Sequence, residues 1–425
     1  MPKGNRISNR VKQDRAFEIL KSGENTLITG PPGSGKTYLI NRFIDYLKEE
    51  QIPFSSTAST GIAATHINGR TIHSWSGVGI RDTLTEKDLK KISKTRYLLK
   101  AIRSSEILII DEVSMLSPNL FDMVSRICQE IRGSAKPFGG MQLVCSGDFF
   151  QLPPIRRNSD EEIRFITDSV VWNQLNMKVC YLENQYRHKD DNLSYLLSGI
   201  RESNINDDHI NILKEAVNRK LDLKISPTKL FTHNMDVDSI NNIELRKIKN
   251  NHKKYKMESS GKDALLKSLK KSCLTPETLI LKKGAKVMFT KNNFSKGYVN
   301  GTLGEVISFN EDDYPIVETF DGEEIIVYPE TWTVDDFDGN AEAKINQIPL
   351  KLAWAITIHK SQGMTLDAAE IDLSKSFEEG MGYVALSRVK KLDTLKLHGF
   401  NKISIRVSTK AKEVDKYLIK ESNKV

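Results

Sequence analysis

The segment Gly30-Pro31-Pro32-Gly33-Ser34-Gly35-Lys36-Thr37 limits the folds open to this chain more than any other. It fits the pattern G-x-x-x-x-G-K-[ST], in which glycines let successive backbone N–H groups turn inward around phosphates. Lys36 can reach the β and γ oxygens, and the Thr37 hydroxyl can bind Mg²⁺. An apolar pair precedes the segment and apolar residues follow it at helical spacing, Leu27-Ile28 and then Leu39, Phe43 and Leu47. The pattern predicts a strand, a phosphate-binding loop and a helix, although glycines in other loops serve turn geometry alone.

Two acidic positions follow short apolar runs of the kind that form buried strands. Asp111-Glu112 comes directly after the run 107–110, and Asp148 follows the run 142–145. Ligands gather at the carboxyl ends of parallel strands, so we expect these acids at the edge that carries the phosphate loop. There Asp111 can hold Mg²⁺, and Glu112 can orient or deprotonate an attacking water. The alternative, a surface acidic pair that caps a helix, leaves the preceding strand unexplained.

The order of the expected elements indicates an α/β protein with parallel sheets. A chain of 425 residues is too long for one ordinary core, so two or more domains are expected. The elements expected near the start are a helix over 11–22, a strand over 25–29, a helix over 36–50, a strand over 54–57 and a helix opening at Ser59-Thr60.

Three segments differ from this pattern. Residues 79–100 are polar and basic, and Thr85-Glu86-Lys87-Asp88 resembles a helix N-cap with its reciprocal acid, which predicts a small insertion on the first domain. Residues 246–271 accumulate lysines, and we interpret them as a solvated linker rather than as a binding patch. Between 303 and 347, alternating strands around a turn at Asp321-Gly322 predict a small β insertion, expected to be a barrel.

Composition excludes some classes of protein. No apolar run approaches the length that spans a bilayer, so no membrane role is expected. The 63 Lys and Arg against 55 Asp and Glu give a net charge of +8, which is compatible with a phosphate-rich partner but not diagnostic. The four cysteines are far apart, so neither a zinc site nor a disulfide framework is implied. The basic N-terminus contains no signal or transit pattern, and a cytoplasmic location is expected.

The motifs, taken in their order along the chain, resemble the superfamily-one DNA helicases and within them the Pif-type family, with RecD-like and phage Dda-like helicases as near relatives. The matching stretches are Gln13, the loop 30–37, Ala58–Ala64, Thr71–Trp75, Asp111–Met115, Gly147–Pro154, Gln185–Arg187, Val299–Gly301, His359–Gly363 and the arginine motif that ends at Arg388. The segment Lys136–Leu143 looks like the signature of the Pif-type branch. Each stretch alone is weak, whereas their order is highly specific.

This resemblance implies two RecA-like P-loop domains, residues 1–185 and 186–425, with ATP bound between them. The insertion at about 79–100 would be the wedge that meets a duplex fork. The β insertion at about 303–347 would pack beside the emerging strand.

The resemblance also implies roles for single residues. Catalysis would fall to Lys36, Glu112, Gln151, Arg187 and Arg388, nucleotide binding to Gln13, Gly30, Pro32, Gly33, Ser34, Gly35, Lys36, Thr37 and Gly363, and metal binding to Thr37 and Asp111. Gln13 would read the adenine, Gln151 would sense the γ-phosphate, and the two arginines would reach across from the second domain. The single-strand track would be lined by Thr60, His73, Thr357, His359 and Ser361. For each of these five, a helix cap or a satisfied polar group is an equal alternative.

The hypothesis from the sequence is an ATP-dependent DNA helicase that uses ATP and Mg²⁺ and moves 5′→3′, by resemblance, on single-stranded DNA. It would act as a monomer at duplex forks in replication, recombination or repair, in a bacterial or phage nucleoid. One alternative is an RNA-directed helicase or a translocase that remodels nucleic-acid complexes. The other is an NTP-gated binding switch, which Gln151 and the two arginines disfavour because a passive binder needs no γ-phosphate sensors.

Overall fold

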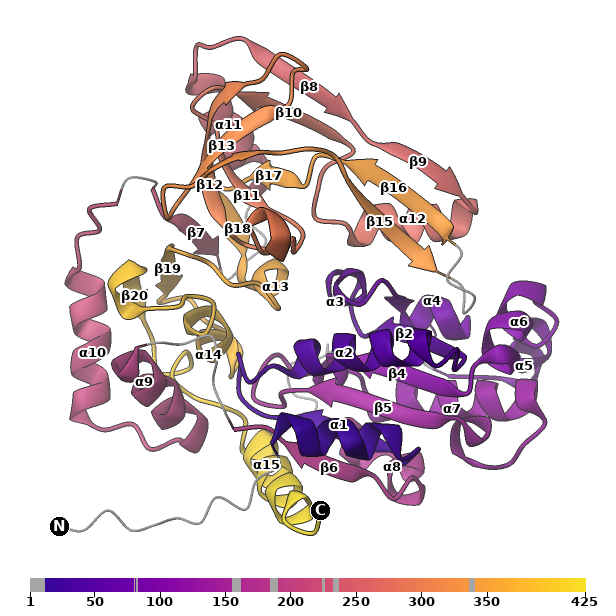
Figure 1. Cartoon of the computed structure of the whole chain (residues 1–425). Coiled ribbons are helices and arrows are strands. Elements are labelled where there is room, and N and C mark those ends of the chain that lie inside the picture. Colours follow the sequence, from indigo (N-terminus) through magenta and orange to yellow (C-terminus); the bar gives the residue numbers. More distant parts are fainter. Residues whose placement is uncertain are drawn as a thin grey trace.

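The computed structural model describes residues 12–79, 81, 83–154, 162–183, 190–223, 226–231, 237–335 and 341–425. Figure 1 shows two α/β units side by side, with a β-rich region above them. The first unit contains the elements up to β6, the second contains α9, α10 and the C-terminal elements, and the β-rich region lies between them in the sequence. The α/β fold expected from the sequence is confirmed.

The first unit is built on a six-stranded parallel sheet with the order β3-β2-β4-β5-β1-β6. Its strands are β1 (Thr26–Thr29), β2 (Phe54–Ala58), β3 (Arg70–Thr71), β4 (Ile107–Asp111), β5 (Gln142–Gly147) and β6 (Lys178–Tyr181). Strands β1 and β4 are buried along their whole length, as short apolar runs are when helices cover both faces of a sheet. The strand expected over 25–29 and the strand expected over 54–57 are therefore confirmed.

Helices surround this sheet. They are α1 (Gln13–Lys21), α2 (Lys36–Glu49), α3 (Gly61–His66), α4 (Ile72–Ser76), α5 (Glu86–Ile92), α6 (Arg96–Ser104), α7 (Pro118–Arg132) and α8 (Val170–Gln174), with 3-10 turns at Val113–Met115, Pro137–Gly140 and Ile166–Asp168. The apolar stripe of α2, which includes Leu39, Phe43 and Leu47, is buried as its spacing predicts. The expected insertion is the α5–α6 pair, and Thr85 and Asp88 form the predicted reciprocal cap of α5.

The second unit has a four-stranded parallel sheet with the order β18-β7-β19-β20. Its strands are β7 (Thr228–Phe231), β18 (Ala355–Thr357), β19 (Ala369–Leu373) and β20 (Leu395–Phe400). Its helices are α9 (Asp191–Glu202), α10 (Asp207–Asn218), α11 (Val237–Lys247), α13 (Ile358–Ser361), α14 (Met381–Leu386) and α15 (Thr409–Ser422), with a 3-10 turn at Leu392–Thr394. One apolar cluster continues from the first unit into this one, for example where the Phe150 and Tyr383 rings meet at 6.3 Å.

The β-rich region consists of antiparallel strands and one helix. A five-stranded sheet has the order β14-β13-β12-β11-β17, a three-stranded sheet has the order β15-β16-β9, and β10 pairs with β8. The elements are β8 (His252–Lys256), β9 (Glu258–Gly261), α12 (Asp263–Ser272), β10 (Thr278–Lys282), β11 (Lys286–Phe289), a 3-10 turn at Phe294–Lys296, β12 (Leu303–Phe309), β13 (Pro315–Thr319), β14 (Glu324–Ile326), β15 (Glu330–Asp335), β16 (Ala341–Gln347) and β17 (Leu350–Leu352).

The interpretation of 246–271 as a solvated linker is wrong, because this segment contains two strands and a helix. In β8 the exposed positions His252, Lys254 and Lys256 alternate with the less exposed Lys253 and Tyr255, and Tyr255 packs against the apolar cluster beneath the five-stranded sheet. In α12 the apolar residues Leu265 and Leu269 are buried. The lysine count hid an ordinary amphipathic alternation, since long basic side chains occupy the solvent faces of these elements.

Helices that could cross a membrane are absent from the described residues, because none is both long and apolar enough.

Candidate functional site

The phosphate loop joins β1 to α2 in a backbone conformation that glycine alone adopts easily. Gly30 has φ +143°, and a Cβ there would lie 2.1 Å from the Leu182 carbonyl oxygen. Gly35, the N-cap of α2, has φ +86°. The Lys36 ammonium donates hydrogen bonds to two loop carbonyls, those of Gly30 at 2.9 Å and Pro31 at 3.0 Å. The loop therefore surrounds the lysine at the N-terminus of α2, where an anion is stabilised.

Asp111 and Glu112 lie where β4 ends, as predicted. Asp111 is 4% exposed and accepts a hydrogen bond from the backbone N–H of Glu112, which has the left-handed φ of 54°. Burial raises the pKa of Asp111 above its usual value. Burial, and then the charge of Asp111, raise the pKa of Glu112 to about 7, although Lys36 and Arg388 oppose the shift. A carboxylate whose pKa lies near neutral is suited to accept a proton from water.

A narrow cavity of about 50 Å³ brings the two α/β units together at these acids. The first unit contributes Thr37, Asp111 and Glu112 to its wall, together with α3 residues, and the second unit contributes His359, Gln362 and Gly363. The Gln362 side chain donates a hydrogen bond to Glu112 Oε2 at 3.4 Å. Gln362 belongs to a stretch that the sequence singled out, but its contact with the acid was not predicted.

The donor set of this cavity fits Mg²⁺. The Thr37 hydroxyl and the Asp111 carboxylate both line it, and oxygen atoms are the ligands that this hard cation prefers. A metal held there would lie beside Lys36, whose charge already favours the ionised form of Asp111.

The two glutamines assigned to the nucleotide lie on the first unit. Gln13, at the start of α1, donates a hydrogen bond to the Ser34 carbonyl at 3.2 Å, which connects it to the phosphate loop. Gln151 is 6% exposed, and its Oε1 is buried without a hydrogen-bond partner among the described residues. The backbone N–H of Gln151 donates to the Asp148 carbonyl at 3.1 Å. A Cβ on Gly380, just before α14, would lie 3.3 Å from the Gln151 carbonyl, so the second unit packs directly on this turn.

Arg388 lies inside the second unit, at 1% exposure, rather than extending freely from it. Its guanidinium donates to the Val384 carbonyl at 2.8 Å and to the Ser387 hydroxyl at 2.7 Å. Its charge nevertheless acts on Glu112, whose pKa it lowers. Arg187, the other predicted arginine, lies outside the described residues.

The two threonines predicted to line the single-strand track are both helix N-caps. Thr60 accepts a hydrogen bond from the Ala63 backbone at the start of α3, and Thr357 accepts one from Lys360 at the start of α13, each at 3.2 Å. Both hydroxyls therefore cap helices, and because each retains capacity for a second hydrogen bond, their contact with a strand stays a prediction.

The other three predicted track residues differ in exposure. Burial lowers the pKa of His73 and of His359 below the usual value, so both imidazoles are neutral at pH 7. His359 on α13 keeps part of its surface exposed to solvent, although the atoms packed around it desolvate the ring. Ser361 is completely buried, and its hydroxyl donates to the Ile358 carbonyl at 2.8 Å. The geometry favours a structural role for the Ser361 side chain.

Sequence reasoning missed Arg201, which connects the two units. From α9 its guanidinium donates to Asp148 Oδ1 at 2.9 Å and to the Tyr383 hydroxyl at 2.8 Å. It also donates to the Tyr181 hydroxyl at 2.8 Å and to Asp415 Oδ1 at 3.0 Å. No motif marks this arginine, because its four side-chain partners come from distant parts of the chain. Asp148 and Tyr383 lay in stretches that the sequence highlighted, whereas Tyr181 and Asp415 did not.

Sequence reasoning also missed His66, the last residue of α3. Its Nε2 lies 2.9 Å from Asn300 Nδ2 in the segment before β12. Burial lowers the pKa of His66 to about 4, so the ring is neutral and can accept the amide proton of Asn300. A Cβ on Gly363, which has φ +79°, would lie 3.1 Å from the same ring. His66 is thus a contact point between the first unit and two of the matched stretches.

Comparison with known proteins matches residues 10–213 to the PIF1-like helicase family and residues 264–309 to the 2B domain of DNA helicase Pif1. The chain is 42% identical to the ATP-dependent DNA helicase Pif1 of Psychrobacter sp., over 95% of this chain and 70% of that protein. It is 35% identical to the ATP-dependent DNA helicase Pif1 of Bdellovibrio bacteriovorus, over 94% and 90% of the two proteins.

Solved structures agree over almost the whole chain. Bacteroides sp. Pif1 in complex with ADP-AlF4 has a TM-score of 0.83 at 30% identity, covering 97% of each chain. Bacteroides Pif1 bound to single-stranded DNA has a TM-score of only 0.64 at 28% identity, covering 98% of each chain. Coverage and identity are nearly equal in the two comparisons. The higher TM-score therefore shows that the arrangement described above is closer to that of the ADP-AlF4 complex than to that of the complex with single-stranded DNA.

Proposed function

Because the chain belongs to the PIF1-like helicase family, we propose that it is an ATP-dependent DNA helicase that moves 5′→3′ along single-stranded DNA. The observation that supports this best is the cavity in which Glu112 of the first unit meets Gln362 of the second. An acid that activates water at the junction of two mobile units can couple hydrolysis to their relative movement. The protein would act as a monomer on DNA, and RNA is the alternative track.

Hydrolysis would proceed by attack of water on the γ-phosphorus of ATP, with cleavage of the bond to the bridging oxygen of ADP. Glu112 would accept the water proton, for which its raised pKa is suited. Lys36 and Arg388 would stabilise the charge that spreads over the γ oxygens, together with Arg187. Mg²⁺, held by Thr37 and Asp111, would neutralise phosphate charge when bound.

Recognition of ATP would use residues around this centre. Gln13 would read the adenine, because its hydrogen bond to the Ser34 carbonyl places it beside the loop that would hold the phosphates. The loop residues from Gly30 to Thr37, Pro32 included, would surround the phosphates, and Gly363 would approach them from the second unit. Gln151 would sense the γ-phosphate, for which it has an unpartnered buried oxygen among the described residues.

The DNA strand would follow the short helices at which the two units meet. Thr60, His73, Thr357 and His359 would offer neutral contacts to phosphates, which carry no sequence preference. Ser361 would hold the turn of α13 from within. The α5–α6 insertion would be the wedge that separates the duplex, and the β-rich region would cover the emerging strand (Figure 1).

The test compares Glu112→Gln with wild type in ATP hydrolysis, oligo(dT) binding and strand separation. We expect hydrolysis and unwinding to fall by about 10²-fold or more, while the Kd for oligo(dT) changes less than about twofold. Glu106→Gln, an exposed acid just before β4, is the matched control and should behave like wild type. Equal loss of binding and hydrolysis, or ATPase activity that DNA does not stimulate, contradicts the proposal.

Direction and track are tested on partial duplexes that carry a 5′ or a 3′ single-stranded tail of DNA or RNA. Unwinding of the 5′-tailed DNA substrate alone is expected. Preference for an RNA tail would favour the RNA-directed alternative.

A further inference from the structure

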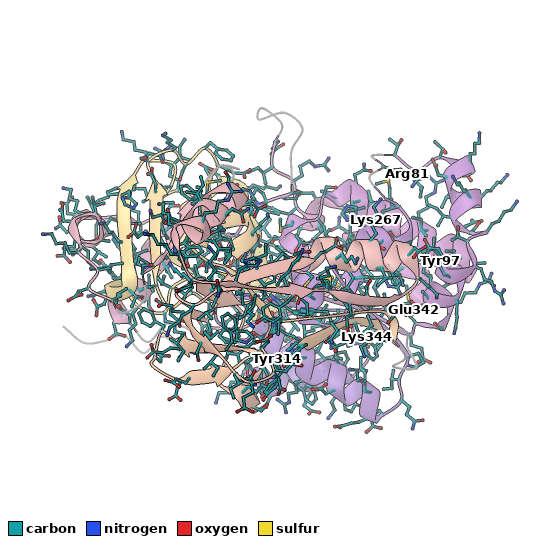
Figure 2. The ribbon with its side chains drawn as sticks, turned by 90° about the horizontal axis from the view of Figure 1, so that it is seen from above. Arg81, Tyr97, Lys267, Tyr314, Glu342 and Lys344 are labelled. Atoms are coloured by element: carbon teal, nitrogen blue, oxygen red, sulfur yellow. The ribbon has the colours of Figure 1, made fainter. Side chains whose placement is uncertain are left out.

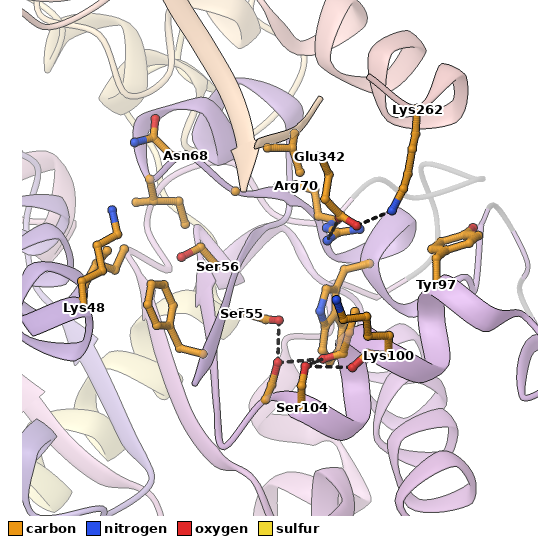
Figure 3. A pocket seen from close by; sticks show the side chains of 18 of the residues that line it. Lys48, Ser55, Ser56, Asn68, Arg70, Tyr97, Lys100, Ser104, Lys262 and Glu342 are labelled. Carbon is orange, nitrogen blue, oxygen red and sulfur yellow. Dashed lines mark hydrogen bonds and ion pairs between the residues drawn. The ribbon is translucent and has the colours of Figure 1, made fainter. Parts of the chain in front are cut away.

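A second, larger cavity of about 590 Å³ lies on the first unit and shares no lining residue with the narrow cavity at Glu112. It opens between α2, strand β2 next to the edge of the sheet, and α6, and the tip of the β-rich region covers one side. Figure 3 shows the side chains that surround it, with Glu342 and Lys262 extending from the β-rich region toward Arg70. The apolar part of its wall is formed by Ile44, Phe54, Ile67, Trp75, Ala101 and Val334.

Two polar atoms in this wall are buried without partners. Trp75 is 0% exposed, and its indole Nε1 has no hydrogen-bond acceptor among the described residues. The Ser56 hydroxyl is also buried without a partner there. Both atoms are covered in this structure, so a ligand in the cavity reaches them only when the groups that cover them shift. Unpaired buried donors are costly, which favours a ligand that brings acceptors into this apolar space. An alkyl or phenyl group would leave them unpaired, whereas a nucleobase has carbonyl oxygens and ring nitrogens on a flat apolar body.

The mouth of the cavity carries an excess of positive charge. Lys48, Arg96 and Lys100 are exposed around it, and within the described part of the chain no carboxylate pairs with any of them. The acid in the lining, Glu342, is already paired with Arg70 at 2.9 Å and with Lys262 at 2.5 Å. The remaining cations suit a phosphate next to a base that enters the apolar part.

The position of the cavity indicates the source of this ligand. Its wall includes α6, which belongs to the insertion that would separate the duplex, and the tip of β16. Tyr97, which is 44% exposed, lies at the same end of the molecule as Glu342 when seen from above (Figure 2) and could stack on a neighbouring base. We propose that this cavity binds one unpaired nucleotide of the displaced DNA strand. The inference rests on the proposed function, which supplies the displaced strand.

The test uses the full chain and forked DNA in which the displaced arm is either a short thymidine run or the same backbone without bases. Wild type should bind the thymidine arm about tenfold more tightly, the discrimination that one bound base provides. Ala101→Trp, which fills the cavity, should abolish this preference. Lys100→Glu, an exposed change that spares the core, should weaken binding of both arms, because both arms carry phosphates. Lys90→Glu, the same charge change on α5 outside the cavity, should weaken both arms less and retain the preference.

Equal affinity of wild type for the two arms overturns the proposal, and so does a preference that survives Ala101→Trp or an equal weakening of arm binding by Lys90→Glu and Lys100→Glu. If the protein binds free dTMP in equilibrium dialysis but shows no preference between the two arms, the displaced strand is not the source of the bound nucleotide. ATPase stimulation by oligo(dT) is measured in parallel. If stimulation is present and the arm preference is absent, this inference fails alone, whereas absent stimulation contradicts the proposed function itself.

Discussion

Replacing Arg201 with methionine should destabilise the protein and weaken the connection between the two α/β units. The Arg201 side chain is 12% exposed and its partner Asp148 is 0% exposed, so the substitution leaves a buried carboxylate without its cation. Loss of one member of such a pair costs about 3–5 kcal/mol. The contact with Asp415 adds less, because that carboxylate is 16% exposed and can be hydrated. We expect the free energy of unfolding to fall by about 3 kcal/mol.

The same substitution should affect catalysis through the turn that carries Gln151. Asp148 Oδ1 accepts the Phe150 N–H at 3.2 Å, and the Arg201 guanidinium lies 4.1 Å from the Phe150 ring. Without Arg201, this turn loses the bridge from Asp148 through the guanidinium to Tyr383 and keeps only a direct hydrogen bond from the Tyr383 hydroxyl to Asp148 Oδ2 at 3.4 Å and the ring contact with Phe150. The kcat of DNA-stimulated hydrolysis should therefore fall, while the KM for ATP changes little because the phosphate loop is untouched.

Urea unfolding and steady-state ATPase assays measure the two effects. Asp148→Asn in the Arg201→Met background is the decisive comparison, since removing the uncompensated charge should restore much of the lost stability. Tyr383→Phe, which deletes the hydroxyl contacts with Arg201 and Asp148 and keeps the ion pair, should cost only about 1 kcal/mol. The reasoning is refuted if Arg201→Met unfolds within about 1 kcal/mol of wild type, or if Asp148→Asn restores none of the loss.

Three further outcomes are expected. Gly30→Ala should lower the free energy of unfolding, measured in urea, by about 2 kcal/mol. Gly30 has φ +143°, and a Cβ there would lie 2.1 Å from a carbonyl oxygen. Gly23→Ala is the control and should cost less, because a Cβ at Gly23 has no atom within 4 Å. Asn300→Ala should raise the pKa of His66 from about 4 as water enters, which NMR titration of the ring detects. Burial lowers the pKa of Lys286 to about 7 in the folded protein. Above that pH this lysine holds its proton in the unfolded chain but loses it in the folded protein. The free energy of unfolding should therefore rise by up to about 1.4 kcal/mol per pH unit between about pH 7 and 10. Lys286→Met should reduce the slope by this amount in unfolding experiments at different pH values, while Lys351, whose pKa burial also lowers to about 7, keeps its own contribution. An unchanged slope contradicts the assignment.

The parts of the fold that follow from short-range pattern could be predicted. The phosphate loop, strand β4 with its terminal acids and the cap of α5 all depend on neighbours within a few residues, so local spacing reveals them. The segment 246–271 was misjudged because lysine content was weighed above alternation. Charge marks the face of an element that meets solvent, and it does not show whether the opposite face is buried.

The parts that could not be predicted depend on tertiary placement. Arg201 is one of many arginines, and its importance arises only when Asp148, Tyr181 and Tyr383 converge on it from separate elements. For Arg388 the difficulty is the reverse. The motif identifies the residue, but it does not reveal that the side chain is buried inside its own unit. Resemblance names a residue type at a position, whereas the direction of its side chain is fixed by packing that no local pattern contains.

The short helix α13 gives a physical reason for coupling between nucleotide and DNA. Its N-cap is Thr357 and its surface carries His359, both expected to face the strand, and Gln362, the residue that follows it, contacts Glu112. With the proposed strand contacts, one turn of chain would belong to both sites, and it could not shift toward the nucleotide without moving those contacts. Arg201 makes a second connection that shares no residue with the first. Two separate connections resist independent movement of the units better than one, so closing of the cleft and gripping of the strand should occur as a single event.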